Sequence, residues 1–427
     1  MREIKDSGIE WIGEIPDNWK IFHFKYIVKE KIDNRGRTPE IDENDIGIPI
    51  IELDAIGNKN PDVEKASKFI SEESYKKYIR KGLKSGDVLF GTVGSIGKCS
   101  IVPNEFNYCI AQNIVGYRFN NDQDSLFWYY YFKSEPFKHM YMQFNKGNIQ
   151  NSIKISNMER GVLVIPPLKE QQFIANFLDK KCAEIDSLHT DIEKQIATLE
   201  EYKKSVITEV VTKGLNPSIK TKSADNKYWE NIPVNWELSD IKYLFEIVKR
   251  IAGKEGYDIL SVTQKGLKIK DISKNEGQIA ESYANYQFVY PTDFVMNHMD
   301  LLTGWVDCSK YFGVTSPDYR VFRLRDTKNN LNYYKYVMQS CYMNKIFYSL
   351  GQGVSNLGRW RLQTSTFNNF KIPVPPLDEQ QQIADYLDSK CSEIDTIIQT
   401  KKEQLDVLAE YKKSLIYEYV TGKKEVK

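Results

Sequence analysis

A glycine-rich stretch, residues 91–99, comes close to a nucleotide-binding motif. It reads Gly91-Thr92-Val93-Gly94-Ser95-Ile96-Gly97-Lys98-Cys99. A P-loop needs a glycine five residues before the Gly-Lys pair, and a Ser or Thr directly after that pair to bind magnesium. Thr92 and Cys99 occupy these two positions, so the sequence argues against ATP binding. Two interpretations stay open: a structural turn between strands, or a loop that approaches a nucleic-acid backbone.

Other residues that could carry out chemistry are few and scattered. The chain has 4 histidines and 6 cysteines. The cysteines lie at positions 99, 109, 182, 308, 341 and 391, with no Cys-x-x-Cys spacing. A zinc site, a disulfide framework and a nucleophile–histidine arrangement are therefore unsupported. We predict no catalytic residue, no cofactor-binding residue and no metal ligand in this chain, which excludes the common classes of enzyme.

The region that must position everything else is a long repeat. Residues 166–172 read Pro-Pro-Leu-Lys-Glu-Gln-Gln, and residues 375–381 read Pro-Pro-Leu-Asp-Glu-Gln-Gln. Both copies end in Glu-Tyr-Lys-Lys-Ser, align without a gap, and are identical at roughly half of their positions. Such a repeat indicates two equivalent halves.

Each copy is predicted to form one long helix that starts after the proline pair. Apolar residues recur every seventh position, which is typical of a coiled coil. The predicted seam consists of Leu178, Ile185, Ile192 and Leu199 in the first copy and Leu387, Ile394, Leu408 and Leu415 in the second. Cys182, Leu188, Ile196, Tyr202 and Tyr411 are among the residues expected to fill in between them. The alternative is a solvated helix of an ordinary helical bundle.

The two halves open alike but differ in the middle. Ile15-Pro-Asp-Asn-Trp19 has its counterpart in Ile232-Pro-Val-Asn-Trp236. Between opening and helix, strand patterns at 86–90, 110–119, 161–165, 286–299 and 321–324 and aromatic helices at 126–142 and 331–348 predict mixed helix and sheet. The Arg359-Trp360-Arg361 segment could grip phosphate and stack on a base, or could be an edge turn with solvated arginines.

Composition sets outer limits. Charged residues make up 27% and hydrophobic residues 41% of the 427 residues, which is typical of a globular protein with two or more domains. No apolar run is long enough to span a membrane and no signal peptide is recognisable, so we expect a cytoplasmic protein. The formal net charge of +1 would not by itself suggest nucleic-acid binding.

The repeated Pro-Pro-Leu-x-Glu-Gln-Gln-x-Ile-Ala helix start resembles the DNA-specificity (S) subunit of type I restriction–modification systems. The Ile-Pro-x-Asn-Trp openings, Gly86-Asp-Val-Leu-Phe90 and Gly313-Val-Thr-Ser-Pro-Asp-Tyr319 are similar to that family as well. The resemblance covers nearly the whole chain. It implies an α+β fold in which two target-recognition domains are separated by two long antiparallel helices, as a coiled-coil spacer with a pseudo-twofold internal repeat.

The implied domains are a first target-recognition domain at 1–165, a spacer helix at 166–213, a linker at 214–228, a second target-recognition domain at 229–374, and a second spacer helix and tail at 375–427. Each recognition domain would read one half of a bipartite, asymmetric site in double-stranded DNA. The helices would set the spacing and dock two methyltransferase subunits, and motor-nuclease subunits would join them. S-adenosylmethionine, ATP and magnesium are expected in those partners only.

Base readout uses Arg, Lys, Asn and Gln side chains on loops. On that ground the candidate DNA contacts are Lys98, Lys146, Asn148, Gln150, Asn356, Arg359 and Arg361. Two rival functions remain: a coiled-coil adaptor that binds proteins without DNA, and an enzyme with an unrecognised active site.

Overall fold

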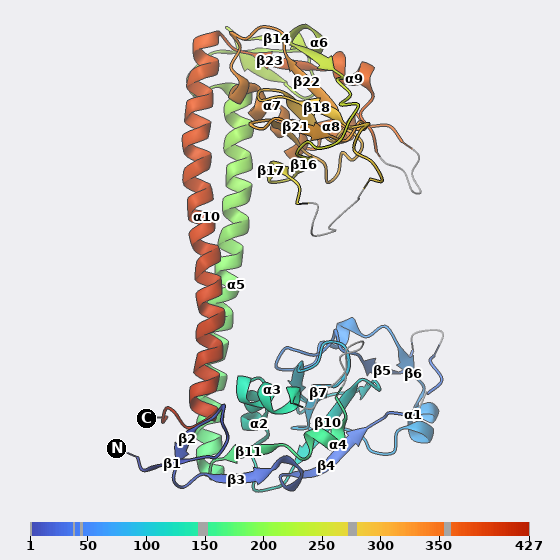
Figure 1. Cartoon of the computed structure of the whole chain (residues 1–427), viewed down its shortest axis with the longest axis vertical. Helices are drawn as coiled ribbons and strands as arrows, with labels where there is room; N and C mark the ends of the chain where they lie inside the picture. Colours follow the sequence, from blue (N-terminus) through green and yellow to red (C-terminus); the bar gives the residue numbers. More distant parts are fainter. Residues whose placement is uncertain are drawn as a thin grey trace. The chain divides into compact units, whose positions relative to one another are not determined.

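The structure is a computed structural model that describes residues 2–36, 39–42, 46–143, 153–271, 280–353 and 360–426. It divides into two compact units: unit 1 comprises residues 1–192 and 403–427, and unit 2 comprises residues 193–402. Two long helices, α5 (Leu168–Lys213) and α10 (Leu377–Val420), join them and pack side by side (Figure 1). The predicted α+β fold with its internal repeat is confirmed.

Unit 1 is built around a four-stranded antiparallel sheet in the order β4-β10-β7-β8. Its strands are β4 (Val28–Asp33), β10 (Ile114–Phe119), β7 (Val88–Gly91) and β8 (Cys99–Ile101). Smaller sheets pair β1 (Ile4–Asp6) with β2 (Glu14–Pro16), β3 (Lys20–His23) with β11 (Val162–Ile165), and β5 (Ile48–Ile51) with both β6 (Phe69–Ile70) and β9 (Cys109–Ile110). The helices are α1 (Glu72–Tyr78), α2 (Ser125–Phe132), α3 (Glu135–Met142) and α4 (Ile155–Met158), with 3-10 turns at Phe24–Tyr26 and Val63–Lys65.

Unit 2 repeats this plan with the sheet order β15-β22-β19-β20. These strands are β15 (Phe245–Val248), β22 (Arg320–Leu324), β19 (Phe294–Met296) and β20 (Val306–Cys308). Two-stranded pairs are β12 (Thr221–Ser223) with β13 (Asn231–Pro233), β14 (Glu237–Asp240) with β23 (Lys371–Val374), β16 (Leu260–Thr263) with β17 (Gly266–Ile269), and β18 (Gln287–Val289) with β21 (Gly313–Thr315). The helices are α6 (Ile241–Leu244), α7 (Leu331–Met343), α8 (Ile346–Ser349) and α9 (Thr364–Asn368).

Each unit encloses a core that takes residues from both long helices. In unit 1, Ile174 and Leu178 of α5 and Leu415 and Val420 of α10 pack with Trp19. In unit 2, Val206 and Val211 near the end of α5 and Ile383 and Leu387 near the start of α10 pack with Trp236. The repeated opening tryptophans are both completely buried.

Two predicted helices are each split in two. The aromatic stretch 126–142 breaks at Lys133–Ser134, where Ser134 caps α3 and Pro136 occupies the first turn. A proline there removes a donor that helix α2 would need in order to continue. The stretch 331–348 breaks at Lys345, which adopts a left-handed conformation with φ of +55°.

The predicted strand at 110–119 is likewise two strands, β9 and β10, and the stretch 286–299 divides into β18 and β19 around Thr292, whose φ is +76°. By contrast, two predictions are confirmed: Gly214 ends the first long helix, and residues 86–90 lead into a buried strand. Gly214 has φ of +75° directly after α5, which glycine adopts without strain.

Candidate nucleic-acid and partner interfaces

A buried glutamine at the start of each long helix holds the neighbouring aromatic helix in place. In unit 1, Gln171 Oε1 accepts from the backbone N–H of Asp124 at 2.8 Å, and Gln171 Nε2 donates to the Pro166 carbonyl at 2.9 Å and to Gln123. In unit 2, Gln380 Oε1 accepts from the N–H of Asn330 at 3.0 Å, and its Nε2 donates to the Pro375 carbonyl and to Asn329.

Asp124 and Asn330 are the N-caps of α2 and α7. The repeated Glu-Gln-Gln motif therefore does more than start a helix, because its first glutamine fixes the aromatic helix that covers the central sheet.

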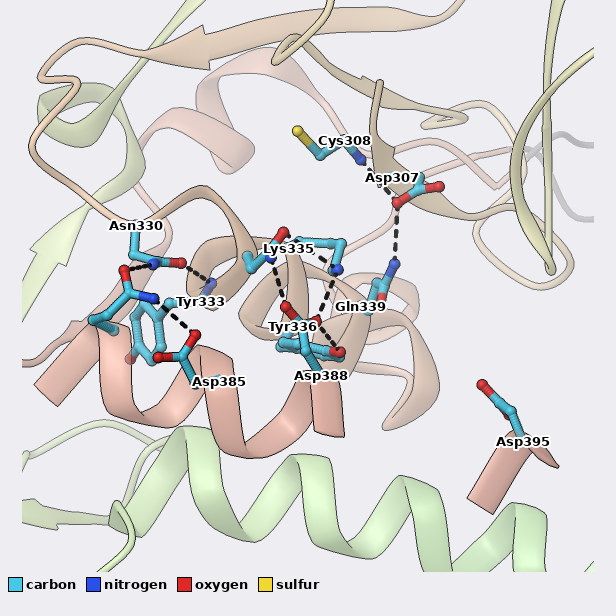
Figure 2. A network of polar contacts seen from close by, with 12 residues as sticks. Asp307, Cys308, Asn330, Tyr333, Lys335, Tyr336, Gln339, Asp385, Asp388 and Asp395 are labelled. Atoms are coloured by element: carbon cyan, nitrogen blue, oxygen red, sulfur yellow. Dashed lines mark hydrogen bonds and ion pairs between the residues drawn. The ribbon is translucent and has the colours of Figure 1, made fainter. Parts of the chain in front are cut away.

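A tyrosine–aspartate contact repeats this docking about two turns further along each long helix. Tyr130 donates to Asp179 on α5 at 3.0 Å, and Tyr336 donates to Asp388 on α10 at 2.7 Å. Burial raises the pKa of both phenols above their ordinary value, so both remain protonated donors at neutral pH. Figure 2 shows the unit 2 contact, where Lys335 also pairs with Asp388 at 3.5 Å.

The two long helices are antiparallel, with one ion pair of the same kind in each unit. Lys412 pairs with Asp186 at 2.6 Å in unit 1, and Lys203 pairs with Asp395 at 2.7 Å in unit 2. These lysines and aspartates occupy equivalent repeat positions. Exposed pairs contribute little to stability, about 0.2–1 kcal/mol each, and both pairs are compatible with the same register of α5 against α10.

The predicted seam residues differ in burial along the helices. Leu178, Ile185, Leu387, Ile394 and Leu415 are buried, whereas Ile192, Leu199 and Leu408 are half-buried. Near the middle of the pair, Lys401 replaces the apolar residue of the first copy and donates to Gln195.

Four apolar side chains at repeated positions of the helix pair stay exposed. Leu188 is 52% exposed and its counterpart Ile397 is 39% exposed, while Tyr202 and its counterpart Tyr411 are 48% and 54% exposed. The prediction that Leu188, Tyr202 and Tyr411 fill in the seam is wrong, because a seam between only two helices is narrow and leaves its flanking positions in solvent. Exposed apolar residues repeated in this way mark a candidate partner interface.

Of the seven candidate DNA contacts, two lie within the described residues. Lys98 is half-buried in the turn between β7 and β8, and its Nζ donates to the Leu53 carbonyl at 3.2 Å. Arg361 is exposed, and its backbone pairs with Gln352. Lys146, Asn148, Gln150, Asn356 and Arg359 lie outside the described residues.

The glycine-rich turn at 91–99 is tightly packed. Gly97 has φ of +92°, and a Cβ there would lie 2.4 Å from the Tyr141 hydroxyl. The backbone N–H of Gly91 donates to the Lys98 carbonyl at 2.9 Å. These contacts favour the interpretation of this segment as a structural turn.

Arg361 lies near a histidine that sequence reasoning did not single out. Burial, with Arg320 and Arg361 nearby, lowers the pKa of His298 to about 4, so this side chain is neutral at pH 7. The buried Arg320 guanidinium donates to the Leu362 carbonyl at 3.0 Å and lies over the Phe367 ring. His298 lies half-buried in the β19–β20 loop, and its Nδ1 is buried without a hydrogen-bond partner among the described residues, so a neutral imidazole lies near the exposed Arg361.

Within the described parts of the chain, no group of three or more His, Cys, Asp or Glu side chains is arranged to hold a metal ion. A search of the same residues finds no helix long and apolar enough to cross a membrane.

Comparison with known proteins identifies the family. The model for the type I restriction modification DNA specificity domain matches twice, at residues 16–198 and 233–407. The chain belongs to this family. It is a non-catalytic specificity subunit of a type I restriction–modification system, and the predicted family is confirmed.

Two relatives are similar to this chain in sequence. The chain is 26% identical to a putative type I restriction enzyme MjaX specificity subunit from Methanocaldococcus jannaschii, over 97% of this chain and 96% of that protein. It is also 26% identical to the MjaVIII specificity subunit of the same organism, over 62% of each chain.

Two solved structures share the fold. One comes from work on the structural basis of complex assembly and conformational transition of the type I R-M system. It has a TM-score of 0.68 at 13% identity, and the match covers 95% of this chain and 98% of that chain. The other, the HsdS subunit from Thermoanaerobacter tengcongensis, has a TM-score of 0.51 at 13% identity, covering 96% and 98%.

The glutamine contact yields a stability prediction. Replacing Gln171 with Leu leaves the Asp124 N–H and the Pro166 carbonyl buried without their partner, at about 1–3 kcal/mol for each group. We expect Gln171→Leu to lower the free energy of unfolding by about 2–6 kcal/mol in urea titrations followed by circular dichroism. The adjacent Gln172 is exposed, so Gln172→Leu serves as the control. Equal effects of the two variants would contradict the assigned role of Gln171.

Proposed function

We propose that this specificity subunit reads a split, asymmetric DNA site, with each target-recognition domain recognising one half-site. The observation that carries the proposal is the double match to the DNA specificity domain, at residues 16–198 and 233–407. The two copies use the same glutamine and tyrosine–aspartate contacts to hold domains whose remaining sequence differs. Two readers of different sequence suit two different half-sites.

The helix pair sets the distance between the half-sites in this proposal. α5 has 46 residues and α10 has 44, which corresponds to rods of about 65–70 Å at 1.5 Å per residue. Antiparallel packing with equivalent ion pairs supports a fixed register, and a fixed register is what a spacing device requires.

The exposed residues Leu188, Ile397, Tyr202 and Tyr411 form the docking surface for two methyltransferase subunits in this proposal. The same pair of side-chain positions is exposed on each helix, which fits two copies of one partner. Methylation of adenine, S-adenosylmethionine binding and ATP-driven cleavage then belong to the methyltransferase and motor-nuclease subunits. The near-neutral net charge of +1 is compatible with DNA binding when those partners share the phosphate contacts.

A methylome comparison tests the function directly. The chain is expressed with its methyltransferase partner, and each is expressed alone, in a host without adenine methylation. We expect a split motif of methylated adenines in single-molecule sequencing only when both are present. An active, bound partner that produces no new motif would refute DNA reading and favour an adaptor.

Lengthening the helix pair tests the spacing role. Seven residues are inserted after Ile192 in α5 and after Lys402 in α10, which preserves the heptad phase and adds about 10 Å. We expect the gap between half-sites to grow by up to about three base pairs, at 3.4 Å each, while the half-site sequences stay unchanged. An unchanged gap in a folded, active variant would sink the spacing proposal.

Charge substitution on the exposed tyrosines tests partner docking. We expect Tyr202→Glu to remove one of two bound methyltransferase subunits, and Tyr202→Glu with Tyr411→Glu to remove both, as measured by native mass spectrometry. Ala197→Glu is the control, because Ala197 is exposed and lies about 140° around α5 from Tyr202 at 100° per residue. Two subunits retained on the double variant would exclude this surface.

A further inference from the structure

A basic β-hairpin in unit 2 has no role in the contacts described so far. It consists of β16 (Leu260–Thr263) and β17 (Gly266–Ile269), joined by Gln264 and Lys265. The tip is internally bonded: Thr263 Oγ1 donates to the Gly266 carbonyl at 2.9 Å, and the Lys265 N–H donates to Thr263 Oγ1 at 3.2 Å. Gly266 has φ of +104°, so this tight turn needs glycine.

The two faces of the hairpin differ in polarity. Leu260, Val262 and Leu267 point to the inner face and pack in a buried cluster with Val289 and Val321. The opposite face carries Ser261 paired with Lys268, because side chains alternate along a strand. Lys268, Gln264 and Lys265 are exposed. The hairpin is thus fixed by its apolar face and presents its polar face to solvent.

Positive charge is concentrated on this hairpin although the chain as a whole is nearly neutral. Lys265 and Lys268 lie within the hairpin, residues 260–269, which contain no Asp or Glu, whereas the net charge of the chain is +1. Among the residues that the structure describes, Lys265 and Lys268 make no ion pair. Two unpaired cations beside an exposed glutamine are suited to a phosphate backbone and a base edge.

Asp307 on β20 contacts both the hairpin and helix α7. Its Oδ2 accepts from the Leu267 N–H at 2.9 Å, and its Oδ1 lies 3.5 Å from Gln339 Nε2 on α7. One turn away on α7, Lys335 and Tyr336 contact Asp388 of α10 (Figure 2). Helix α7 therefore contacts α10 through Lys335 and Tyr336 and contacts Asp307 through Gln339, and Asp307 in turn bonds to the hairpin.

We propose that the β16–β17 hairpin enters the major groove of duplex DNA as a two-stranded ribbon. The major groove admits such a ribbon, and a glutamine can bond in a bidentate manner to adenine N6 and N7. Lys265 and Lys268 contact phosphates, and Gln264 reads a base edge. The inference rests on the proposed function and assigns to this hairpin part of the half-site read by the second target-recognition domain.

Salt dependence tests the phosphate contacts. The full chain, in complex with its methyltransferase partner, is titrated with a fluorescent duplex that carries the methylated motif, at 50–300 mM salt. We expect Lys265→Gln with Lys268→Gln to reduce the slope of log Kobs against log salt by about 0.9 per lost contact. The matched control is Lys328→Gln with Lys371→Gln, which removes the same charge from exposed positions. Lys371 lies on β23, at the opposite end of unit 2 from the hairpin (Figure 1).

Base reading is tested by the methylome. We expect Gln264→Ala to relax one base pair of one half-site and leave the other half-site and the gap unchanged. If Gln264→Ala weakens binding equally for all DNA sequences and leaves the motif intact, Gln264 reads no base.

The outcomes separate this inference from the proposed function. If the wild-type complex binds the duplex without salt dependence and produces no motif, the proposed function fails. If the wild-type complex reads a split motif while the hairpin and control variants change the slope equally, the hairpin proposal alone fails. In that case the lysines only protect an exposed edge strand from pairing with another chain.

Discussion

Each long helix packs into two hydrophobic cores, one at each of its ends. The first turns of α5 bury Ile174 and Leu178 in unit 1, and its last turns bury Val206 and Val211 in unit 2; α10 does the reverse. Burial of one such side chain contributes about 1.5–3 kcal/mol. Interruption of either helix would therefore weaken both cores, and the sequence between the buried ends must remain helical although it is mostly solvated.

The two units share the contacts at the long helices and differ in the strands and loops beyond them. The buried Gln171 and Gln380 and the aspartates 179 and 388 form the same socket twice. Because this socket holds backbone groups and tyrosine hydroxyls, it places few demands on the strands beyond the aromatic helix. The strands and loops can then differ between the units without disturbing the framework.

The sequence was sufficient to predict the family, the repeated helices and the buried strands, because these features depend on local periodicity and on a motif that occurs twice. It did not reveal which residue of Glu-Gln-Gln is buried, since Gln171 and Gln172 are chemically identical and only tertiary packing distinguishes them. The parallel pairing of β5 with β9 is equally long-range. Tyr202 was assigned to the seam because its spacing fits, although the narrow two-helix contact leaves it exposed. The candidate DNA contacts were predicted from loop position and side-chain chemistry, and neither reveals how a loop side chain packs: Lys98 donates to the Leu53 carbonyl.

Unit 1 is built from both ends of the chain, and this affects how the protein folds during synthesis on the ribosome. Its core needs Leu415, Ile416 and Val420, whereas unit 2 is complete once residue 402 has emerged. Chains are made from the N-terminus, so the second unit can close while the first, although made earlier, still exposes Trp19 and its neighbours. A chain that stops short of residue 403 would carry an open apolar core next to a closed one. Such a product is a ready target for chaperones and proteases, and its removal would keep half-built subunits out of the restriction complex.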